Sequence, residues 1–383
     1  MLAQNSRMFL DTMNIALYCY YAYSIMNDEK NEVVGGMEMQ LIKLARELQH
    51  RGHSVEFMVG DFGQPDTCES GGFMFHKIFD RSRSSLLRKI SYFCRIIRTM
   101  QADIILERGS SDITGFLCLC AHALRKKYVF SAASDVNLVR DADDPSIRTG
   151  SRRWLFRYAI RNADNIIVQK KSQNELLSRS FGRRGKEIAN MPLIAIDTVR
   201  AANGNNITWI SNLNTYKRPD LCLDLARRLP AYSFVMAGAA RDPRYYGEME
   251  FLASSIPNVR FCGFVPPHKI PHLLAESRVL INTTIIDGKY EEGFPNAFLQ
   301  AWSQGVPVVS LISNPDKIIT EKGLGFCSGS IDRMADDLRL LMEDDTIHNA
   351  IARNCVTYMR EYPDVSSIVD QYESLLKATL AHP

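Results

Sequence analysis

The chain has 383 residues, of which 46% are hydrophobic and 23% charged, and its formal net charge is +3. This length exceeds what one hydrophobic core usually supports and predicts two domains of ordinary size. No apolar run approaches the roughly 20 residues of a membrane-spanning helix, and the N-terminal stretch lacks the apolar core of a cleaved signal.

The charge is divided unevenly along the chain. Residues 1–190 carry 28 Lys and Arg against 21 Asp and Glu, a net +7, whereas residues 191–383 carry 18 against 22, a net −4, and the two sum to +3. A basic N-terminal half is compatible with an anionic partner, but no nucleic-acid-binding module accompanies it, so we expect no nucleic acid. Nine cysteines without a CxxC pair lie mostly in apolar segments and predict reduced thiols in a cytoplasmic protein.

Short apolar or β-branched runs alternate with segments of helical period along the whole chain. In the N-terminal half the predicted strands are residues 14–20, 54–60, 102–107, 127–131 and 164–169, with a helix over 36–52. In the C-terminal half they are residues 207–211, 232–238, 258–264, 278–284 and 306–311, with helices over 218–229, 268–277 and 296–304. Such alternation is typical of parallel α/β architecture, so we predict an α/β fold with two doubly wound domains.

The predicted boundary lies in residues 190–205, where Pro192 and a Gly/Asn cluster interrupt the periodicity. We therefore expect an N-terminal domain over residues 1–192, a C-terminal domain over 193–360, and a helical segment over 361–383 that packs back on the N-terminal domain. Ligands of such folds bind at the carboxyl ends of the strands, which predicts a site in the cleft between the domains.

Residues 292–305 combine a carboxylate, a turn and the start of a helix. Backbone N–H groups at a helix start attract phosphate, and Glu292 in the same turn can accept hydrogen bonds from the hydroxyl groups of a sugar. The stretch is compatible with a site for a sugar attached to a phosphate. Equally, Glu292 favours the helix dipole and the Gly-Phe-Pro sequence shapes a turn.

The stretches EGFPNAFLQAW and GVPVVS resemble the donor-site motif of family 4 glycosyltransferases. That family has the GT-B architecture, in which two Rossmann-like doubly wound domains face each other across an inter-domain cleft. Other similar stretches are GGMEMQLIKLARELQHRGHSV, ADNIIVQKKSQNELL, WISNLNTYKRPDLCLDLA and NVRFCGFVPPHKIPHLLAES, so the resemblance covers nearly the whole chain. It implies a retaining, metal-independent transferase that moves a sugar from a nucleotide diphosphate sugar to a glycan, lipid-linked or other hydroxyl acceptor, with no cofactor.

The resemblance also implies which residues bind the donor phosphates. In the family's pattern a Gly-Arg pair ends the strand that opens the second domain, and a Lys follows five residues after that Arg. Here the pair is Ser211-Asn212, while Lys217 keeps its place. Asn212 donates a hydrogen bond but brings no charge, and Arg218 is the neighbouring candidate to replace that charge.

Further donor-side residues follow from the same motif. Glu292 matches the glutamate that holds the transferred sugar, with backbone and amide groups of Gly293, Phe294, Pro295 and Asn296 nearby. Gln300 stands where the family usually has a second glutamate that binds the ribose hydroxyls. Because a neutral acceptor binds more weakly than a carboxylate, we expect weaker nucleotide binding but not its loss.

Two features of the N-terminal half resemble the family in part. Gly35-Gly36 is similar to its glycine loop, whose missing side chains let the backbone approach the donor phosphates and the acceptor. After the strand 127–131 many members place a His near the reacting carbon, but this chain has Asp135. Asp135 either orients an acceptor hydroxyl or caps the following turn.

Two metal-like patterns lack further ligands. Asp141-Ala142-Asp143 spells Asp-x-Asp in an acidic loop, and His268 and His272 have the spacing of a zinc pair but no third ligand in view. We expect no metal site.

Residues 81–100 carry six basic residues and no acidic one, with apolar residues at helical spacing. Such a helix can lie on an anionic membrane surface, which predicts peripheral contact at the inner face of the membrane. Its apolar stripe fits equally well against the N-terminal sheet. Two other functions also remain open: a GT-B sugar-nucleotide epimerase, and a non-catalytic sugar-nucleotide-binding or partner subunit.

Overall fold

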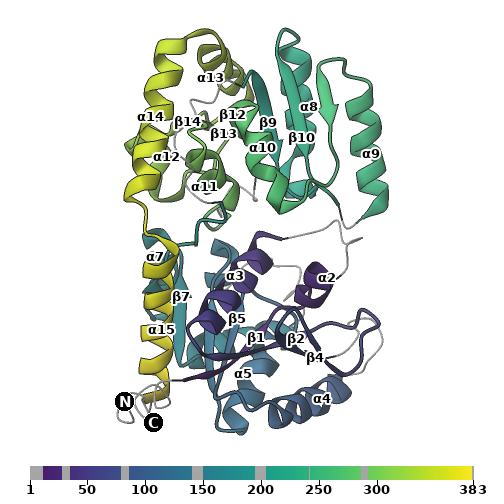
Figure 1. Cartoon of the computed structure of the whole chain (residues 1–383), viewed down its shortest axis with the longest axis vertical. Coiled ribbons are helices and arrows are strands. Elements are labelled where there is room, and N and C mark those ends of the chain that lie inside the picture. The colour runs from purple at the N-terminus through teal and green to yellow at the C-terminus, as the bar shows by residue number, and fades with distance from the viewer. Residues whose placement is uncertain are drawn as a thin grey trace, which may run out of the picture. The chain divides into compact units, whose positions relative to one another are not determined.

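The computed structural model describes residues 12–27, 35–78, 86–139, 150–194, 204–240, 242–285 and 292–381. Contacts group them into two units (Figure 1). The N-terminal unit comprises the described residues within Met1–Asn31, Gly36–Met191 and Asp364–Pro383, and the C-terminal unit those within Glu32–Gly35 and Pro192–Pro363. Each unit is built on a largely or wholly parallel sheet, which confirms the predicted α/β fold with two doubly wound sheets.

The sheet of the N-terminal unit has eight strands in the order β3-β4-β2-β1-β5-β6-β7-β8. They are β1 (Asn14–Tyr18), β2 (Ser54–Val59), β3 (Thr67–Ser70), β4 (Phe73–Lys77), β5 (Ile104–Arg108), β6 (Lys127–Ser131), β7 (Asn165–Val168) and β8 (Lys186–Glu187). All neighbours pair in parallel except β3 and β4. The central strands β1, β5 and β6 are almost wholly buried because parallel strands are covered on both faces.

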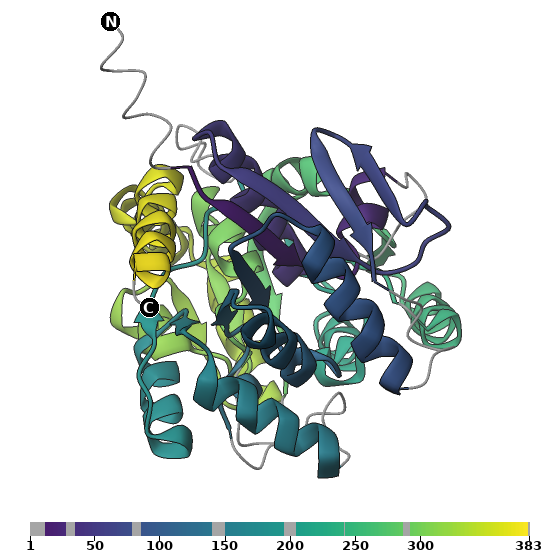
Figure 2. The ribbon, with the colours of Figure 1, turned by 90° about the horizontal axis from the view of Figure 1, so that it is seen from below.

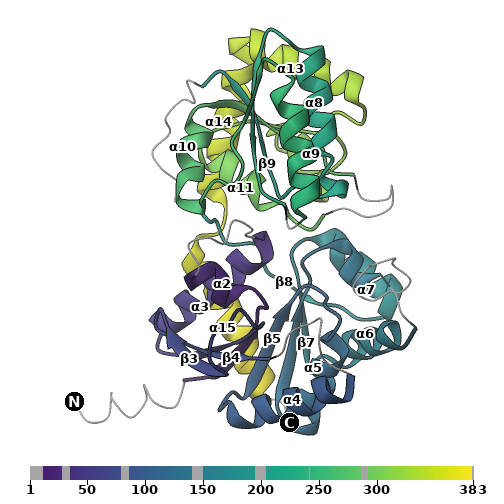
Figure 3. The same cartoon turned by 90° about the vertical axis from the view of Figure 1, so that its right-hand side faces the viewer.

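Helices cover both faces of this sheet. They are α2 (Ala22–Asn27), α3 (Gly36–His50), α4 (Leu86–Thr99), α5 (Thr114–Ala123), α6 (Gly150–Asn162), α7 (Lys171–Phe181), α15 (Val365–Ala381) and the 3₁₀ turn η1 (Asp135–Leu138). α4 packs on α5 and α5 packs on α6, whereas α15 packs on α3. Figures 2 and 3 show these two groups on different sides of β1 and β5.

The apolar stripe of α4 is part of the core. Phe93 and Ile97 are buried in the cluster that also holds Leu117 of α5, while Arg95 and Arg98 are exposed. The stripe therefore packs inside the unit at the described positions, and its basic residues remain on the surface. No described helix is long and apolar enough to cross a membrane.

The sheet of the C-terminal unit has six parallel strands in the order β11-β10-β9-β12-β13-β14. They are β9 (Asn206–Ile210), β10 (Ser233–Ala237), β11 (Val259–Phe261), β12 (Ser277–Asn282), β13 (Val308–Ser310) and β14 (Gly325–Cys327). The chain first adds strands on one side of β9 and then returns to its other side with β12. The strand order therefore reverses between β9 and β12, which is the switch point where doubly wound sheets bind ligands.

The helices of this unit also form two layers. They are α8 (Pro219–Arg228), α9 (Pro243–Ser254), α10 (Ile270–Ala275), α11 (Asn296–Ser303), α12 (Ile318–Glu321), α13 (Ile331–Glu343) and α14 (Asp345–Glu361). In the described part of this unit, three 3₁₀ turns each precede a helix: η3 (Thr215–Lys217) before α8, η4 (Pro267–Lys269) before α10 and η5 (Pro315–Lys317) before α12. Figure 3 shows α8 and α9 on one side of β9, with α10, α11 and α14 on the other.

All ten predicted strands are present, but four strands were not predicted. β3 and β4 form a hairpin whose two-residue loop, Gly71-Gly72, has positive φ at both positions (56° and 82°). Two glycines between short runs are a hairpin pattern that the sequence contained. β8 and β14 are edge strands of only two and three residues.

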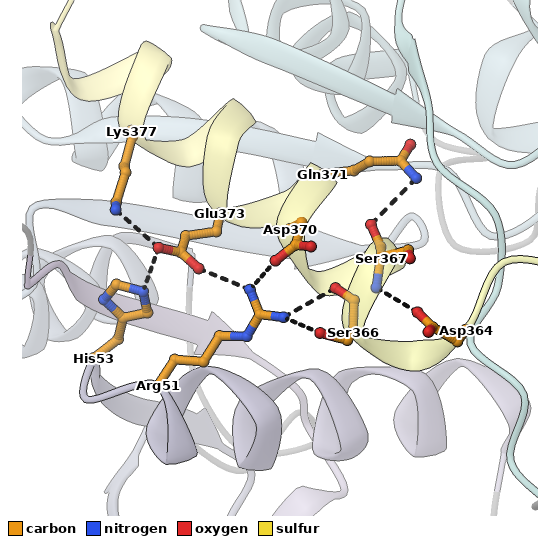
Figure 4. Close-up of polar contacts among 9 residues, drawn as sticks. All are labelled: Arg51, His53, Asp364, Ser366, Ser367, Asp370, Gln371, Glu373 and Lys377. Carbon is orange, nitrogen blue, oxygen red and sulfur yellow. Dashed lines mark hydrogen bonds and ion pairs between the residues drawn. The ribbon is translucent and has the colours of Figure 1, made fainter.

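α15 is held on the N-terminal unit by a polar cluster that joins it to the end of α3 and the start of β2 (Figure 4). Arg51 donates to the carboxylates of Asp370 at 2.5 Å and Glu373 at 2.9 Å. Glu373 also lies 2.8 Å from Lys377 and 3.5 Å from His53. On its buried face α15 contributes Ile368, Val369, Tyr372 and Leu376. The last helix of the chain is thus part of the N-terminal unit's packing.

Candidate functional site

Two loops leave the carboxyl ends of neighbouring strands at the switch point of the C-terminal unit. The loop after β9 forms η3 and ends at Lys217, and the chain after β12 leads to Glu292 and α11. Gly238, just after β10, allows the loop after β9 to pass closely, because an added Cβ would lie 1.8 Å from the carbonyl oxygen of Ser211. The two predicted charged donor-site residues therefore come from adjacent strand ends.

Lys217 and Glu292 form an ion pair. The Lys217 Nζ donates to Glu292 Oε1 and lies 5.4 Å from the centre of the Tyr216 ring. The lysine is only 7% exposed, and a buried ammonium group requires an opposite charge or a π-face in its surroundings. The pair gathers one cation and one anion at the switch point.

The second carboxylate oxygen of Glu292 has no partner among the described residues. Oε2 is buried and makes no hydrogen bond to any described residue. Buried polar atoms are nearly always hydrogen-bonded, so such an oxygen is a position where a ligand hydroxyl can donate.

Aromatic packing fixes the start of α11 behind Glu292. The Phe294 ring meets Trp302 edge to face at 6.2 Å, and Trp302 also contacts Phe298 at 5.6 Å and Tyr358 at 5.4 Å. Phe298 and Trp302 are fully buried. Because this cluster anchors α11 from one side, the N–H groups of its first turn have a defined direction.

The remaining residues of the motif lie in that first turn or the next. Gly293 and Pro295 are buried, Pro295 directly precedes α11, and Asn296 begins it. Gln300 lies one helical turn later and is half-buried. Its side chain makes no hydrogen bond with the rest of the described chain.

The two predicted phosphate-side neighbours of Lys217 differ in their partners. Asn212 is half-buried, and no hydrogen bond joins its side chain to the described residues. Arg218, by contrast, donates to Asp220 through Nε (2.9 Å) and Nη2 (2.7 Å), which raises the pKa of its guanidinium group. Arg218 is thus already paired and does not replace the missing charge at Asn212 unless Asp220 releases it.

The predicted residues of the N-terminal half are divided between the two units: Gly35 belongs to the C-terminal unit, and Gly36 and Asp135 belong to the N-terminal unit. Gly36 begins α3, and Gly35 precedes it. Asp135 begins η1, is 5% exposed, and accepts from Lys170 Nζ at 3.3 Å and Gln173 Nε2 at 3.1 Å. These partners fix the orientation of its carboxylate.

The sequence did not point to several polar groups near the switch point. Thr283 follows β12 and hydrogen-bonds the loop that carries Lys217. Ser310 and Ser313, at and just after the end of β13, have buried hydroxyl groups without partners among the described residues. Each lies at or just beyond the end of a predicted strand, and this position was the only indication of them in the sequence.

Only one of the two metal-like patterns lies within the described residues. Among the described residues, no group of three or more His, Cys, Asp or Glu side chains is arranged to hold a metal ion. His268 lies in η4 and His272 in α10, where it is 3.5 Å from Glu276. Asp141 and Asp143 lie outside the described residues.

Two family profiles match the sequence. Glycosyltransferase Family 4 matches residues 34–191, and Glycosyl transferases group 1 matches residues 204–344. Together they span most of both units, and the chain belongs to this family of glycosyltransferases, as its motifs predicted. No curated protein matches the sequence significantly.

Solved structures show the same fold at low sequence identity. Sucrose-phosphate synthase from Thermosynechococcus elongatus aligns with a TM-score of 0.78 at 16% identity, over 97% of this chain and all of that one. Anabaena HepE in complex with UDP-glucose aligns at 0.73 and 18% identity, over 96% and 100%. A mutant of S. aureus TarM in complex with fondaparinux, alpha-GlcNAc-glycerol and UDP aligns at 0.72 and 12% identity, over 95% and 99%. The fold is that of GT-B glycosyltransferases, and the protein is an enzyme of this class.

Proposed function

We propose that this glycosyltransferase moves a sugar from a nucleotide diphosphate sugar to a hydroxyl group of a glycan or lipid-linked acceptor in polysaccharide or glycoconjugate synthesis. The observation that carries the proposal is the Lys217–Glu292 pair at the switch point, with the second oxygen of Glu292 lacking a partner among the described residues. The proposal is supported by the UDP-glucose bound in HepE and the UDP bound in TarM, which make UDP sugars the first donors to test.

The donor's pyrophosphate gains negative charge as its bond to the sugar breaks. In the proposed reaction Lys217 and the N–H groups at the start of α11 stabilise that charge. These protein groups can meet the charge without an essential metal. Glu292 accepts hydrogen bonds from hydroxyl groups of the sugar, Gly293, Phe294, Pro295 and Asn296 surround it, and Asn212 and Gln300 complete the nucleotide contacts.

The proposed transfer retains the configuration at the reacting carbon. The acceptor oxygen bonds to that carbon on the face from which the phosphate oxygen departs, and the departing phosphate takes the acceptor's proton. No protein nucleophile is needed in this scheme. Asp135, held by Lys170 and Gln173, is the proposed residue that orients the acceptor hydroxyl, and Gly35-Gly36 is the proposed place where backbone approaches the substrates.

We also propose a cytoplasmic enzyme that contacts an anionic membrane surface through residues 81–100. Since Phe93 and Ile97 are buried in the core, the contact would be made by the exposed Arg95 and Arg98 rather than by an inserted apolar face. Basic residues near an anionic leaflet contribute about 1 kcal/mol each.

Replacement of Glu292 by alanine tests the central assignment. Release of UDP from UDP sugars and transfer to glycan acceptors are measured with a chelator present, for the wild type and Glu292→Ala. Turnover is expected to be abolished in Glu292→Ala and unchanged in Glu276→Ala, a half-exposed glutamate of the same unit that pairs with Arg260. Full activity in Glu292→Ala contradicts its role, and an inverted anomeric carbon in the product, seen by NMR, contradicts retention.

A further inference from the structure

A chain of hydrogen bonds joins the centre of the C-terminal sheet to the loop that carries Lys217. The Trp209 Nε1 donates to Thr283 Oγ1 at 3.0 Å, and Thr283 Oγ1 donates to the carbonyl oxygen of Lys217 at 2.8 Å. We propose that Thr283 is a positioning residue that fixes Lys217 at the switch point. This inference rests on the role proposed above for Lys217.

Strand register explains why these side chains meet. Trp209 of β9 lies opposite Ile281 of β12, and Thr283 is two residues beyond Ile281. Residues two apart along an extended chain point to the same face, so Thr283 lies just past the indole ring. Trp209 and Thr283 are 1% and 0% exposed, so both bonds are shielded from bulk water.

The direction of the hydroxyl group is fixed by its two partners. A threonine hydroxyl has one proton, and the indole N–H can only donate. Because Trp209 donates to the oxygen of Thr283, the hydroxyl proton is directed to Lys217. Trp209 therefore orients Thr283, and Thr283 orients the loop.

A second bond ties the same loop to the end of β12. The backbone N–H of Ile285 donates to the carbonyl oxygen of Tyr216 at 2.8 Å. η3 itself has only three residues, has no side-chain cap, and is followed by Arg218 in a left-handed conformation (φ 49°). A turn this short has little stability of its own, so its position depends on these external bonds.

The position of Lys217 matters because neither Asn212 nor Arg218 provides the same charged contact. Asn212 is neutral, and Arg218 is paired with Asp220. Lys217 is paired as well, but with Glu292, the proposed sugar-binding residue, so its ammonium group already lies within the candidate site. A displacement of the order of 1 Å in a group that stabilises a transition state lowers the rate by up to about a hundredfold.

Valine in place of Thr283 removes the hydroxyl group and keeps the shape. With UDP-glucose as the donor, Thr283→Val is expected to lower kcat roughly tenfold and to raise KM by a smaller factor, because Lys217 contacts the phosphates of the bound donor and also acts on the charge that develops as the bond breaks. Thr283→Ser keeps the hydroxyl and should retain activity. The matched control is Thr208→Val. Thr208 directly precedes Trp209, and the substitution removes a buried hydroxyl group that is hydrogen-bonded to Ser277.

A second measurement does not depend on the reaction. The rate of reductive methylation of the Lys217 amine, followed by mass spectrometry, reports how firmly the lysine is held. It should rise several-fold in Thr283→Val and stay unchanged in Thr283→Ser and Thr208→Val. An unchanged methylation rate in Thr283→Val overturns the inference. The inference is also overturned if Thr283→Val is methylated faster than the wild type but has normal turnover, while the turnover of Lys217→Ala is impaired. If Lys217→Ala itself has normal turnover, the proposed role of Lys217 is wrong, and the methylation rate alone then decides whether Thr283 positions it.

Discussion

Lys217 and Glu292 are 75 residues apart in the sequence and form an ion pair in the structure. A basic residue after one strand and an acidic residue after another come together because β9 and β12 are neighbours in the sheet. A phosphate group binds to a cation, whereas the hydroxyl groups of a sugar donate hydrogen bonds to an anion. This pair offers a cation and an anion within one site. At the scale of single residues, the proposed donor site depends on these two side chains.

Gln300 gives a test of the nucleotide side. Gln300→Glu restores a charged acceptor at a position whose side chain has no hydrogen-bond partner in the described structure. Each bond to a charged acceptor is stronger by about 1 kcal/mol, so donor binding should tighten about fivefold for one such bond. Isothermal titration calorimetry with UDP-glucose measures the change.

Gln304→Glu is the control for that substitution. Gln304 follows the last residue of α11 and lies one turn beyond Gln300, so it adds the same charge farther from the start of the helix. Equal or weaker binding by Gln300→Glu contradicts the assignment of residue 300 to the ribose.

At the scale of elements, the contacts of α15 with the rest of the N-terminal unit include two groups that titrate, Glu373 and His53. Burial by itself raises the pKa of Glu373, but hydrogen bonds from Lys377 and Arg51 outweigh it and bring the pKa to about 2, below the ordinary 4.5. Burial lowers the pKa of His53, against the opposing charge of Glu373. Both groups therefore bind protons more readily in the unfolded chain than in the folded one.

The folded state should consequently lose stability in acid. Protonation of the unfolded chain at His53 begins near pH 6.5, and the contribution of Glu373 is lost as the pH falls from about 4.5 toward 2. Urea unfolding between pH 7 and pH 3 measures this loss. Glu373→Gln should be less stable at pH 7 and show a weaker dependence on pH below 4.5, whereas the exposed control Glu361→Gln should behave like the wild type.

The basic surface of α4 gives a second prediction at this scale. If the enzyme contacts membranes through residues 81–100, the joint replacement Arg95→Ala and Arg98→Ala should weaken binding to vesicles that contain anionic lipid by roughly tenfold or more. Sedimentation with vesicles at low and high salt measures it, with the exposed Arg353→Ala as the control. Equal binding by the double variant and the wild type contradicts the proposed contact.

At the scale of the whole molecule, period and alternation in the sequence were enough to predict the two sheets and their class. Strands such as β1 and β6 are continuous apolar runs because both of their faces are covered, and such runs are visible without a structure. The short strands β8 and β14 are held by their neighbours and leave no pattern of their own.

The candidate site residues could be predicted where a motif carried them, whereas the side-chain partners of these residues could not. Lys217 and Glu292 stand in recognisable stretches, and the structure brings them together. The pairing of Arg218 with Asp220, the bonds of Asp135 to Lys170 and Gln173, and the bond of Thr283 to Lys217 depend on side-chain directions, which no period in the sequence fixes. Lys170 and Gln173 are 35 and 38 residues from Asp135 and have no sequence pattern in common with it.

Binding of nucleotide sugars tests the central claim most directly. UDP, GDP, ADP and TDP sugars are titrated into the protein by calorimetry with a chelator present, and release of free nucleotide is followed in parallel. We predict micromolar binding of one nucleotide class, nucleotide release from its sugar, and weaker binding by Lys217→Ala. Absence of binding across the panel, or tight binding that Lys217→Ala leaves unchanged, contradicts a donor site at the switch point of the C-terminal unit.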